Sequence, residues 1–90
     1  GLRIAIDRGG TFTDCLGQLP ASGTENAGRD IVIKLLSHDP SNYRDAPTEG
    51  IRRILEVATG RKIPRSHKIS TEDIDSVSYT HLRAHETSLH

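Results

Sequence analysis

The sequence predicts a small α/β unit in which a β-hairpin, a third strand and one helix share a core. Two apolar stretches, residues 2–6 and 12–19, flank a pair of adjacent glycines, which is the pattern of two antiparallel strands joined by a turn. Residues 31–36 are apolar nearly throughout and begin with β-branched side chains, as strands often do. Further along, apolar residues recur with the period of an amphipathic helix.

Each strand has its own sequence signal. Residues 2–6 form a short apolar run that ends at Asp7, which suits a strand buried on both faces. Residues 12–19 are expected to be its antiparallel partner. Residues 20–30 are rich in Gly, Ser, Asn and Thr without periodic apolar positions, so we expect a surface connection. Residues 31–36 would then add a third strand beside the hairpin, and residues 74–76 would start a further strand.

The helix is expected to begin after Asp45 and to end at Gly60. Asp45 is suited to cap the first turn, Pro47 loses no hydrogen bond there, and Gly60 tolerates the left-handed backbone that often ends a helix. One stripe follows the i, i+3, i+4, i+7 spacing and should pack on the sheet: Ile51, Ile54, Leu55 and Ala58. The charged residues of the opposite side should be solvated: Glu49, Arg52, Arg53 and Glu56.

Composition limits the classes of protein that the chain can belong to. Ninety residues with 33% hydrophobic residues, one Phe and no Trp or Met make a thin core, so we expect a fragment of a longer protein. Basic and acidic residues balance at 12 each, which argues against nucleic acid and a lipid surface as partners. No apolar run reaches membrane-spanning length. The single Cys15 allows no internal disulfide, so we expect a small apolar residue on a strand and a reducing, cytoplasmic compartment.

Candidate chemistry is concentrated in residues 7–14, which read Asp-Arg-Gly-Gly-Thr-Phe-Thr-Asp. Gly9 and Gly10 lack Cβ, so the backbone can adopt positive φ and let an anion approach its N–H groups closely. Thr11 and Thr13 add hydroxyl donors, and each bond to a phosphate oxygen could contribute about 1.5 to 3 kcal/mol. This composition favours a phosphate-binding loop.

The two carboxylates of this segment sharpen the prediction. Asp7 and Asp14 would repel a free polyphosphate unless a hard divalent cation lies between carboxylate and phosphate. The segment therefore predicts a magnesium–nucleotide complex rather than free phosphate. The alternative from composition alone is a plain β-hairpin whose acids are only solvated, because short glycine motifs are weak signals.

Residues 7–14 resemble the first phosphate motif of the hydantoinase A and 5-oxoprolinase family, a branch of the actin, hexokinase and sugar-kinase ATPase superfamily. A second block, residues 34–37 with residues 39–55, is similar to 5-oxoprolinases in particular. Arg8 also favours that branch, since hydantoinase relatives more often carry an aliphatic residue there. The resemblance covers about residues 2–76 and implies a partial N-terminal ATPase-like domain over residues 1–76, of the ribonuclease-H-like type.

The resemblance also implies an activity for the parent protein. It would be an ATP-dependent hydrolase that opens 5-oxo-L-proline to L-glutamate while ATP is cleaved to ADP and phosphate. In that reading Asp7 organises Mg²⁺ through water and is the catalytic carboxylate, while Gly9, Gly10 and Thr11 hold phosphate oxygens. Thr13 and Asp14 hold the loop or the metal shell. The expected partners are 5-oxo-L-proline and ATP, and a homo-oligomeric parent stays open.

The family pattern breaks at residue 77. Residues 77–90 resemble one reading frame of a sequencing-library adapter, so we expect a non-native tail and leave it out of the predicted fold. Three alternatives remain open for function. The parent could be a hydantoinase or acetone-carboxylase type of relative. It could instead be a non-catalytic nucleotide-binding module. The third alternative concerns the isolated 90-residue fragment, which we expect to be inactive by itself.

Overall fold

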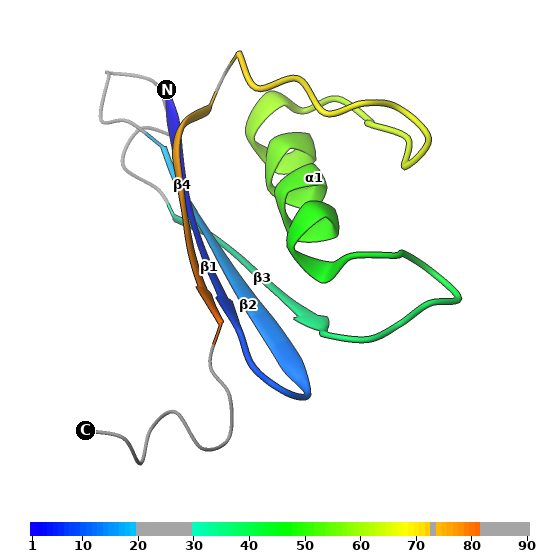
Figure 1. The fold of residues 1–90 in the computed structure, drawn as a ribbon. Coiled ribbons are helices and arrows are strands. Elements are labelled where there is room, and N and C mark those ends of the chain that lie inside the picture. The colour runs from blue at the N-terminus through cyan, green and yellow to red at the C-terminus, as the bar shows by residue number, and fades with distance from the viewer. Residues whose placement is uncertain (20–29, 73, 82–90) are drawn as a thin grey trace, which may run out of the picture.

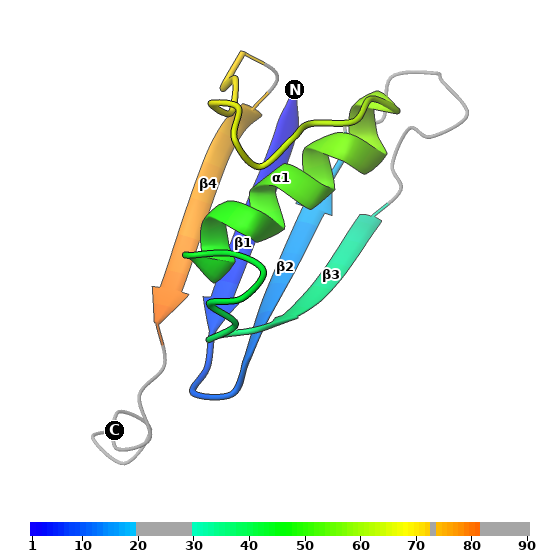
Figure 2. The same ribbon diagram turned by 90° about the vertical axis from the view of Figure 1, so that its right-hand side faces the viewer.

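The computed structural model describes residues 1–19, 30–72 and 74–81. Its elements in chain order are β1 (Leu2–Arg8), β2 (Phe12–Gln18), β3 (Asp30–Leu36), α1 (Ala46–Thr59) and β4 (Ile74–His81). The four strands form one sheet in the order β3-β2-β1-β4, and α1 lies across one face of it (Figures 1 and 2). The predicted hairpin, third strand and packed helix are confirmed. The predicted connection over residues 20–30 lies almost entirely outside the described residues.

The sheet is mixed. β1 pairs antiparallel with β2, and β2 pairs antiparallel with β3. β4 lies on the other side of β1 and runs parallel to it, which the long crossover through α1 makes possible. The register of the hairpin places Asp7 opposite Asp14 and Arg8 opposite Thr13. All of the predicted site residues therefore lie at one end of the two central strands.

Only one face of the sheet is covered. Leu2, Ile4 and Ile6 are buried on the helix side, whereas Arg3 and Ala5 are exposed on the other side. The prediction that residues 2–6 are buried on both faces is therefore wrong for the described structure. Arg3 already interrupts the apolar run, and the strand alternates as a half-covered strand does. We call the uncovered side the outer face.

The helix begins and ends where the sequence predicts. Asp45 accepts a hydrogen bond from the N–H of Thr48 at 2.9 Å, and Pro47 lies in the first turn. Gly60 has a φ of 69° and donates its N–H to the carbonyl of Glu56 at 2.9 Å. Both ends therefore have the caps that satisfy terminal backbone groups.

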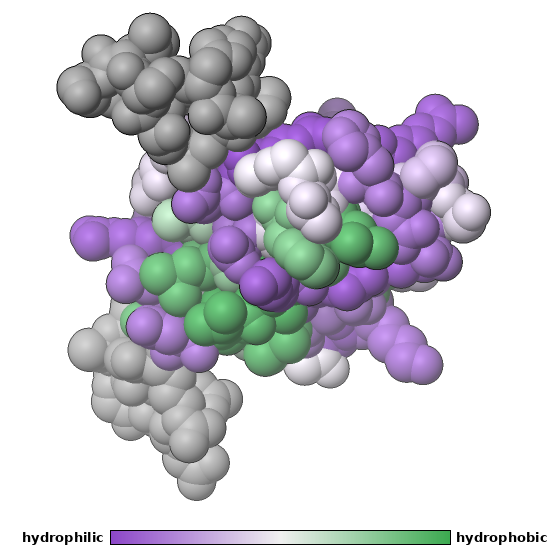
Figure 3. Space-filling model, turned by 90° about the horizontal axis from the view of Figure 1, so that it is seen from below, coloured by the Kyte–Doolittle hydropathy of each residue, from purple (hydrophilic) through white to green (hydrophobic). Residues whose placement is uncertain are grey.

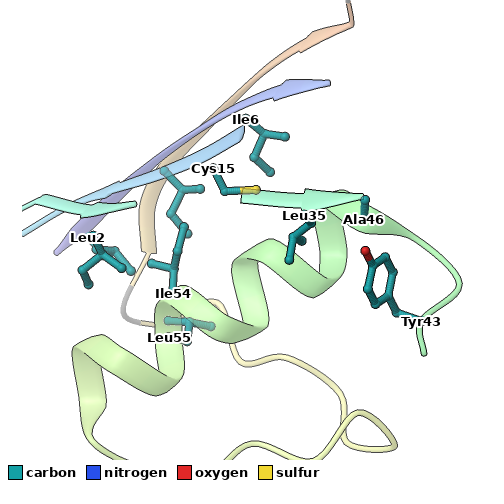
Figure 4. Packing of buried hydrophobic residues seen from close by; sticks show 10 residues of the cluster. Leu2, Ile6, Cys15, Leu35, Tyr43, Ala46, Ile54 and Leu55 are labelled. Carbon is teal, nitrogen blue, oxygen red and sulfur yellow. The ribbon is translucent and has the colours of Figure 1, made fainter. Parts of the chain in front are cut away.

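The core lies between α1 and the sheet. Ile54 and Leu55 of the predicted stripe are buried against residues of the strands, including Leu2, Cys15 and Leu35 (Figure 4). Ile51 and Ala58 pack at the edge of this cluster. The helical period of the sequence therefore identified the covered side of the helix correctly.

Small residues let the helix approach the sheet closely. A Cβ on Gly50 of α1 would overlap the sulfur of Cys15, and a Cβ on Gly17 of β2 would overlap the Cγ2 of Ile54. Cys15 is itself 1% exposed, as expected for a small apolar residue on a strand. The close crossing of α1 and β2 thus depends on glycine at both positions.

The strand predicted to start at residues 74–76 is confirmed, and it continues further than we expected. β4 extends to His81, so residues 77–81 pair with β1 although the predicted fold omitted them. Residues 82–90 lie outside the described residues. The interpretation of residues 77–90 as non-native is not tested by this pairing and stays a prediction.

Candidate functional site

The turn between β1 and β2 differs in detail from the predicted loop. The N–H of Gly9 donates to the carbonyl of Phe12 at 2.9 Å, which closes the hairpin. Gly60 is the only glycine with positive φ in the described parts of the chain, so Gly9 and Gly10 do not adopt the predicted left-handed backbone. The Gly9 N–H is also engaged inside the turn. A role for Gly9 in holding phosphate through its N–H is therefore not supported by this geometry.

The tip of the hairpin nevertheless presents donors to solvent. Among the described residues, no partner accepts a hydrogen bond from the N–H of Gly10, the N–H of Thr11 or the hydroxyl of Thr11. Both residues are exposed, and no heavy atom lies within 4 Å of the position of a Cβ on Gly10. Three donors at a compact, open tip suit the oxygens of an anion.

Two carboxylates lie just below this tip. Asp7 and Asp14 are directly opposite each other in the register, so their Cβ atoms lie about 5 Å apart on the same face. Both are exposed on the outer face. Lys34 is the partner of Asp14 on β3, and its ammonium lies 4.7 Å from the centroid of the Phe12 ring. Like charges directly opposite each other are destabilising, so a cation between the two carboxylates would relieve repulsion.

Thr13 and Ser37 lie beneath the turn rather than on its surface. Thr13 is 0% exposed, and its hydroxyl lies 2.8 Å from the hydroxyl of Ser37. The Ser37 hydroxyl also donates to the carbonyl of Gly9 at 2.7 Å. Of the roles expected for Thr13, holding the loop agrees with this buried position, whereas direct contact with phosphate or with the shell of a metal does not.

A second set of contacts ties the turn to the start of α1. Arg8 donates to the carbonyl of Ser37 at 3.3 Å, and its guanidinium lies 3.9 Å from the carboxylate of Asp45, the helix cap. Tyr43 donates its hydroxyl to the carbonyl of Leu36 at 2.6 Å and so fixes the bend that follows β3. The bend between β3 and α1 therefore contacts the hairpin through Ser37 and Asp45.

Sequence reasoning did not identify Ser37 as part of this site. It stands in the second block of the family resemblance, immediately after β3, where a polar residue follows two leucines. A buried hydroxyl at the end of an apolar strand is a signal that pattern alone does not separate from an ordinary turn residue. Its contacts appear only when β3 lies beside the hairpin.

Glu49 is the largest departure from the predicted solvated helix side. It is 3% exposed and accepts hydrogen bonds from three guanidinium groups, those of Arg52, Arg53 and Arg65. Burial acts to raise the pKa of Glu49, but the bonds from Arg52, Arg65 and Arg53 outweigh it and lower the pKa to about 2. The i+3 and i+4 spacing of Arg52 and Arg53 was the available signal, while Arg65 comes from a distant segment.

A hollow of about 790 Å³ lies on the other side of the bend, away from the hairpin. It is bounded by residues 40–45, by the start of α1 and by residues 65–69. None of the predicted site residues lines it. The predicted residues instead lie at one end of the two central strands, where all but Gly9 and Thr13 are exposed.

Cys15 has no feature of a reactive thiol. Burial, together with the neighbouring charge of Asp14, raises the pKa of its thiol to about 11, although Arg53 acts in the opposite direction. It lies against Gly50 in the core. Its role is packing.

The donor set is compatible with Mg²⁺ held largely by its ligand and by water. No group of three or more His, Cys, Asp and Glu residues is placed to hold a metal among the residues that the structure describes. Mg²⁺ commonly uses one or two carboxylates together with substrate phosphates and waters, rather than a cage made by the protein alone. Asp7 and Asp14, beside the free donors of the tip, fit that requirement.

Comparison with known proteins assigns the chain to a family. Residues 3–81 match the family described as the hydantoinase/oxoprolinase N-terminal region. Because this match covers most of the chain, the protein belongs to that family. The resemblance stated from residues 7–14, 34–37 and 39–55 is confirmed.

Several curated relatives are 5-oxoprolinases. The chain is 59% identical to 5-oxoprolinase 1 of Arabidopsis thaliana over 73 residues, which are 81% of this chain and 5% of the relative. It is 54% identical to the 5-oxoprolinase of Saccharomyces cerevisiae over 76 residues, or 84% of this chain and 6% of the relative. For the 5-oxoprolinase of Dictyostelium discoideum the identity is 45% over 82 residues, or 91% of this chain and 6% of the relative. The chain thus spans about one twentieth of the length of these relatives.

No solved structure matches the chain. Within the described residues, no helix has both the length and the apolar character needed to cross a membrane.

Proposed function

We propose that this chain is part of an ATP-dependent 5-oxoprolinase and that the end of the β1–β2 hairpin contacts the magnesium-bound phosphates of ATP. The observation that carries the proposal is the arrangement at that end. Free N–H groups of Gly10 and Thr11 lie at the tip, and the carboxylates of Asp7 and Asp14 face one another just below it. The names of the relatives supply the reaction class.

We assign to each residue a role that agrees with its position. Gly10 and Thr11 donate to phosphate oxygens, since their N–H groups and the Thr11 hydroxyl have no acceptor among the described residues. Asp7 and Asp14 hold the waters of Mg²⁺ and compensate its charge. When bound, Mg·ATP supplies the phosphoryl group that activates the amide oxygen of 5-oxo-L-proline toward hydrolysis. The contribution of this chain is positioning and charge neutralisation, which dominate such transfers.

We propose that this segment is part of a larger protein. The matched residues make up only 5% and 6% of the length of two of the relatives. The outer face also leaves large apolar side chains uncovered, such as Val32 at 70% exposure. Apolar surface also gathers in patches at the end of the molecule seen from below (Figure 3). We propose that this sheet is the first part of a ribonuclease-H-like lobe of that protein. We also propose that the protein acts in the cytoplasm and that the 90-residue chain alone is inactive.

Substrate-dependent ATP cleavage tests the function. The full-length protein containing these residues should release ADP and L-glutamate in equal amounts when given Mg·ATP and 5-oxo-L-proline. ADP release that requires a hydantoin instead would favour the related hydantoinase activity. Binding of Mg·ATP without cleavage in the presence of either compound would favour a non-catalytic nucleotide-binding module. Either of these results would overturn the proposed reaction.

A further inference from the structure

Two buried hydroxyl groups form a short chain of hydrogen bonds under the turn. Thr13 is 0% exposed and Ser37 is 3% exposed, so neither hydroxyl contacts solvent to a useful extent. The Thr13 and Ser37 oxygens lie 2.8 Å apart, and the Ser37 oxygen lies 2.7 Å from the carbonyl oxygen of Gly9. These contacts join β2, the end of β3 and the turn at one point.

The direction of the chain follows from the number of protons. A carbonyl oxygen can only accept, so the Ser37 hydroxyl must donate to Gly9. A serine hydroxyl has one proton, and Ser37 therefore cannot also donate to Thr13. Thr13 must donate to Ser37, and the order is Thr13 hydroxyl to Ser37 hydroxyl to Gly9 carbonyl. Bonds in such a sequence polarise and strengthen one another.

The last bond in this chain fixes the orientation of a peptide group. The carbonyl of Gly9 and the N–H of Gly10 belong to the same peptide unit, which is planar and trans. The carbonyl and the N–H of a trans peptide point in opposite directions. Because Ser37 holds the Gly9 carbonyl inward, the Gly10 N–H points away from the protein.

Ser37 also holds the other side of the same turn. Its backbone N–H donates to the carbonyl of Thr11 at 2.8 Å. Ser37 thus binds the carbonyls of Gly9 and Thr11, the two residues that flank Gly10, with its side chain and its backbone. The guanidinium of Arg8 in turn donates to the Ser37 carbonyl at 3.3 Å. Ser37 therefore provides the hydrogen bonds that orient the backbone on both sides of the turn.

We propose that Ser37 is a positioning residue of the phosphate-binding turn, which aims the Gly10 N–H at the ligand through its bond to the Gly9 carbonyl. This inference rests on the proposed function of the turn. It adds a residue from outside the glycine motif, and it assigns Thr13 a supporting role through Ser37. The class of ligand is a magnesium-bound polyphosphate.

The test compares two substitutions that each remove one buried hydroxyl bonded to a carbonyl. Ser37→Ala removes the bond to Gly9, whereas Tyr43→Phe removes the bond of 2.6 Å to Leu36 and leaves the turn untouched. The affinity of the full-length protein for Mg·ATP is measured by calorimetry, together with the midpoint of thermal unfolding. Loss of one oriented donor predicts at least about a tenfold weaker affinity for Ser37→Ala and less than about threefold for Tyr43→Phe.

The thermal midpoint separates positioning from stability. If both variants lose similar stability but only Ser37→Ala loses affinity, the positioning role is supported. Equal affinity for the two variants would overturn it. Should Ser37→Ala fail to fold, Thr13→Val takes its place, because it removes the donor that polarises Ser37 but keeps the bond to Gly9. Its loss of affinity should lie between those of Tyr43→Phe and Gly10→Val, and a loss no greater than that of Tyr43→Phe would overturn the inference.

Failure of the proposed function gives a different result. If Asp7→Asn and Gly10→Val both leave the affinity for Mg·ATP unchanged, the turn does not contact the ligand and the proposed function is wrong. If those two variants lose affinity while Ser37→Ala does not, the function stands and only the positioning role of Ser37 is wrong.

Discussion

Gly9 and Gly10 are adjacent in the sequence but meet different requirements in the turn. A Cβ on Gly9 would lie 3.1 Å from the carbonyl oxygen of Phe12, so the closed turn limits what can stand there. Gly10 has open space around the Cβ position and no positive φ. Its small size therefore matters for access to the neighbouring N–H groups rather than for the fold.

Substitution of Gly10 separates ligand access from stability. In Gly10→Val, a branched side chain stands beside the free N–H groups, and loss of even one charge-assisted hydrogen bond should weaken Mg·ATP binding about tenfold or more. The thermal midpoint should change little, because nothing in the described structure meets the new side chain. Calorimetry and thermal unfolding measure the two quantities. Undiminished affinity for Mg·ATP would contradict the assignment of the tip.

Glu49 shows how one buried carboxylate can hold a segment in place. It joins α1 to Arg65, which stands beyond the end of the helix, through bonds of 3.0 and 3.1 Å. A buried carboxylate is tolerated when it is paired and hydrogen-bonded, as here with three guanidinium groups. The pKa of about 2, against an ordinary value of 4.5, expresses the same preference for the charged form.

The depressed pKa of Glu49 predicts an acid-sensitive contribution to stability. Its folded-state pKa is below its unfolded value, so the contribution is complete above about pH 4.5 and is lost as pH falls toward about 2. The shift corresponds to a free energy on the order of 3 kcal/mol. Denaturant unfolding of the chain between pH 2 and 7 should show a steeper loss for the unsubstituted protein than for Glu49→Gln. Parallel pH profiles for the two proteins would show that Glu49 is not the group responsible.

At the scale of elements, the crossing of α1 over β2 depends on the absence of side chains. Gly50 faces the sulfur of Cys15, and Gly17 faces Ile54. Because neither glycine has a Cβ, the backbones of the helix and the strand can approach closely. Glycine inside a helix ordinarily costs about 1 kcal/mol relative to alanine. The close packing offsets that cost, because Cys15, which lies against Gly50, is only 1% exposed.

Substitution of Gly50 tests this contact. Gly50→Ala should destabilise the chain by about 1 to 3 kcal/mol despite the better helix propensity of alanine, since the added methyl overlaps the sulfur of Cys15. Gly10→Ala is the matched control, because the same methyl there meets no neighbour. Denaturant unfolding of both variants measures the difference. An increase in stability for Gly50→Ala would mean that helix propensity outweighs packing at this position.

The elements themselves could largely be predicted from the sequence. The caps at Asp45 and Gly60 and the stripe that contains Ile54 are local signals, and the structure confirms them. The contacts of Ser37 and Glu49 could not be predicted in the same way. Ser37 meets Gly9 across 28 residues, and Arg65 meets Glu49 across 16, so both depend on how separate elements pack.

At the scale of the whole molecule, the covered face could be predicted only in part. The alternation of Arg3 and Ala5 with buried neighbours becomes meaningful once a single helix is placed on one side of the sheet. β4 adds apolar side chains on the helix side that α1 does not cover, with Tyr79 at 50% exposure. The partial cover agrees with a chain that spans about one twentieth of its relatives.

The sequence suggested most residues of the candidate site but not their geometry. Asp7 and Asp14 could be paired from the hairpin alone, because a tight turn centred on residues 10 and 11 fixes the register. The direction of each backbone donor could not, since it depends on the contacts of Ser37 beneath the turn. The residues of the turn were therefore identified from the sequence, whereas Ser37 and the hydrogen bonds of Gly9 and Thr13 are visible only in the structure.

The most direct measurement is the calorimetric affinity of the full-length protein for Mg·ATP, compared among the unsubstituted protein, Asp7→Asn and Asp30→Asn. Asp30 is an exposed carboxylate on the same outer face, at the opposite end of the sheet from the turn. We expect Asp7→Asn to lose at least about tenfold in affinity and to abolish ATP cleavage, with equal or slightly higher thermal stability because repulsion from Asp14 is removed. Asp30→Asn should behave like the unsubstituted protein. Equal affinity and turnover in all three proteins would contradict the assignment of the hairpin as the Mg·ATP site.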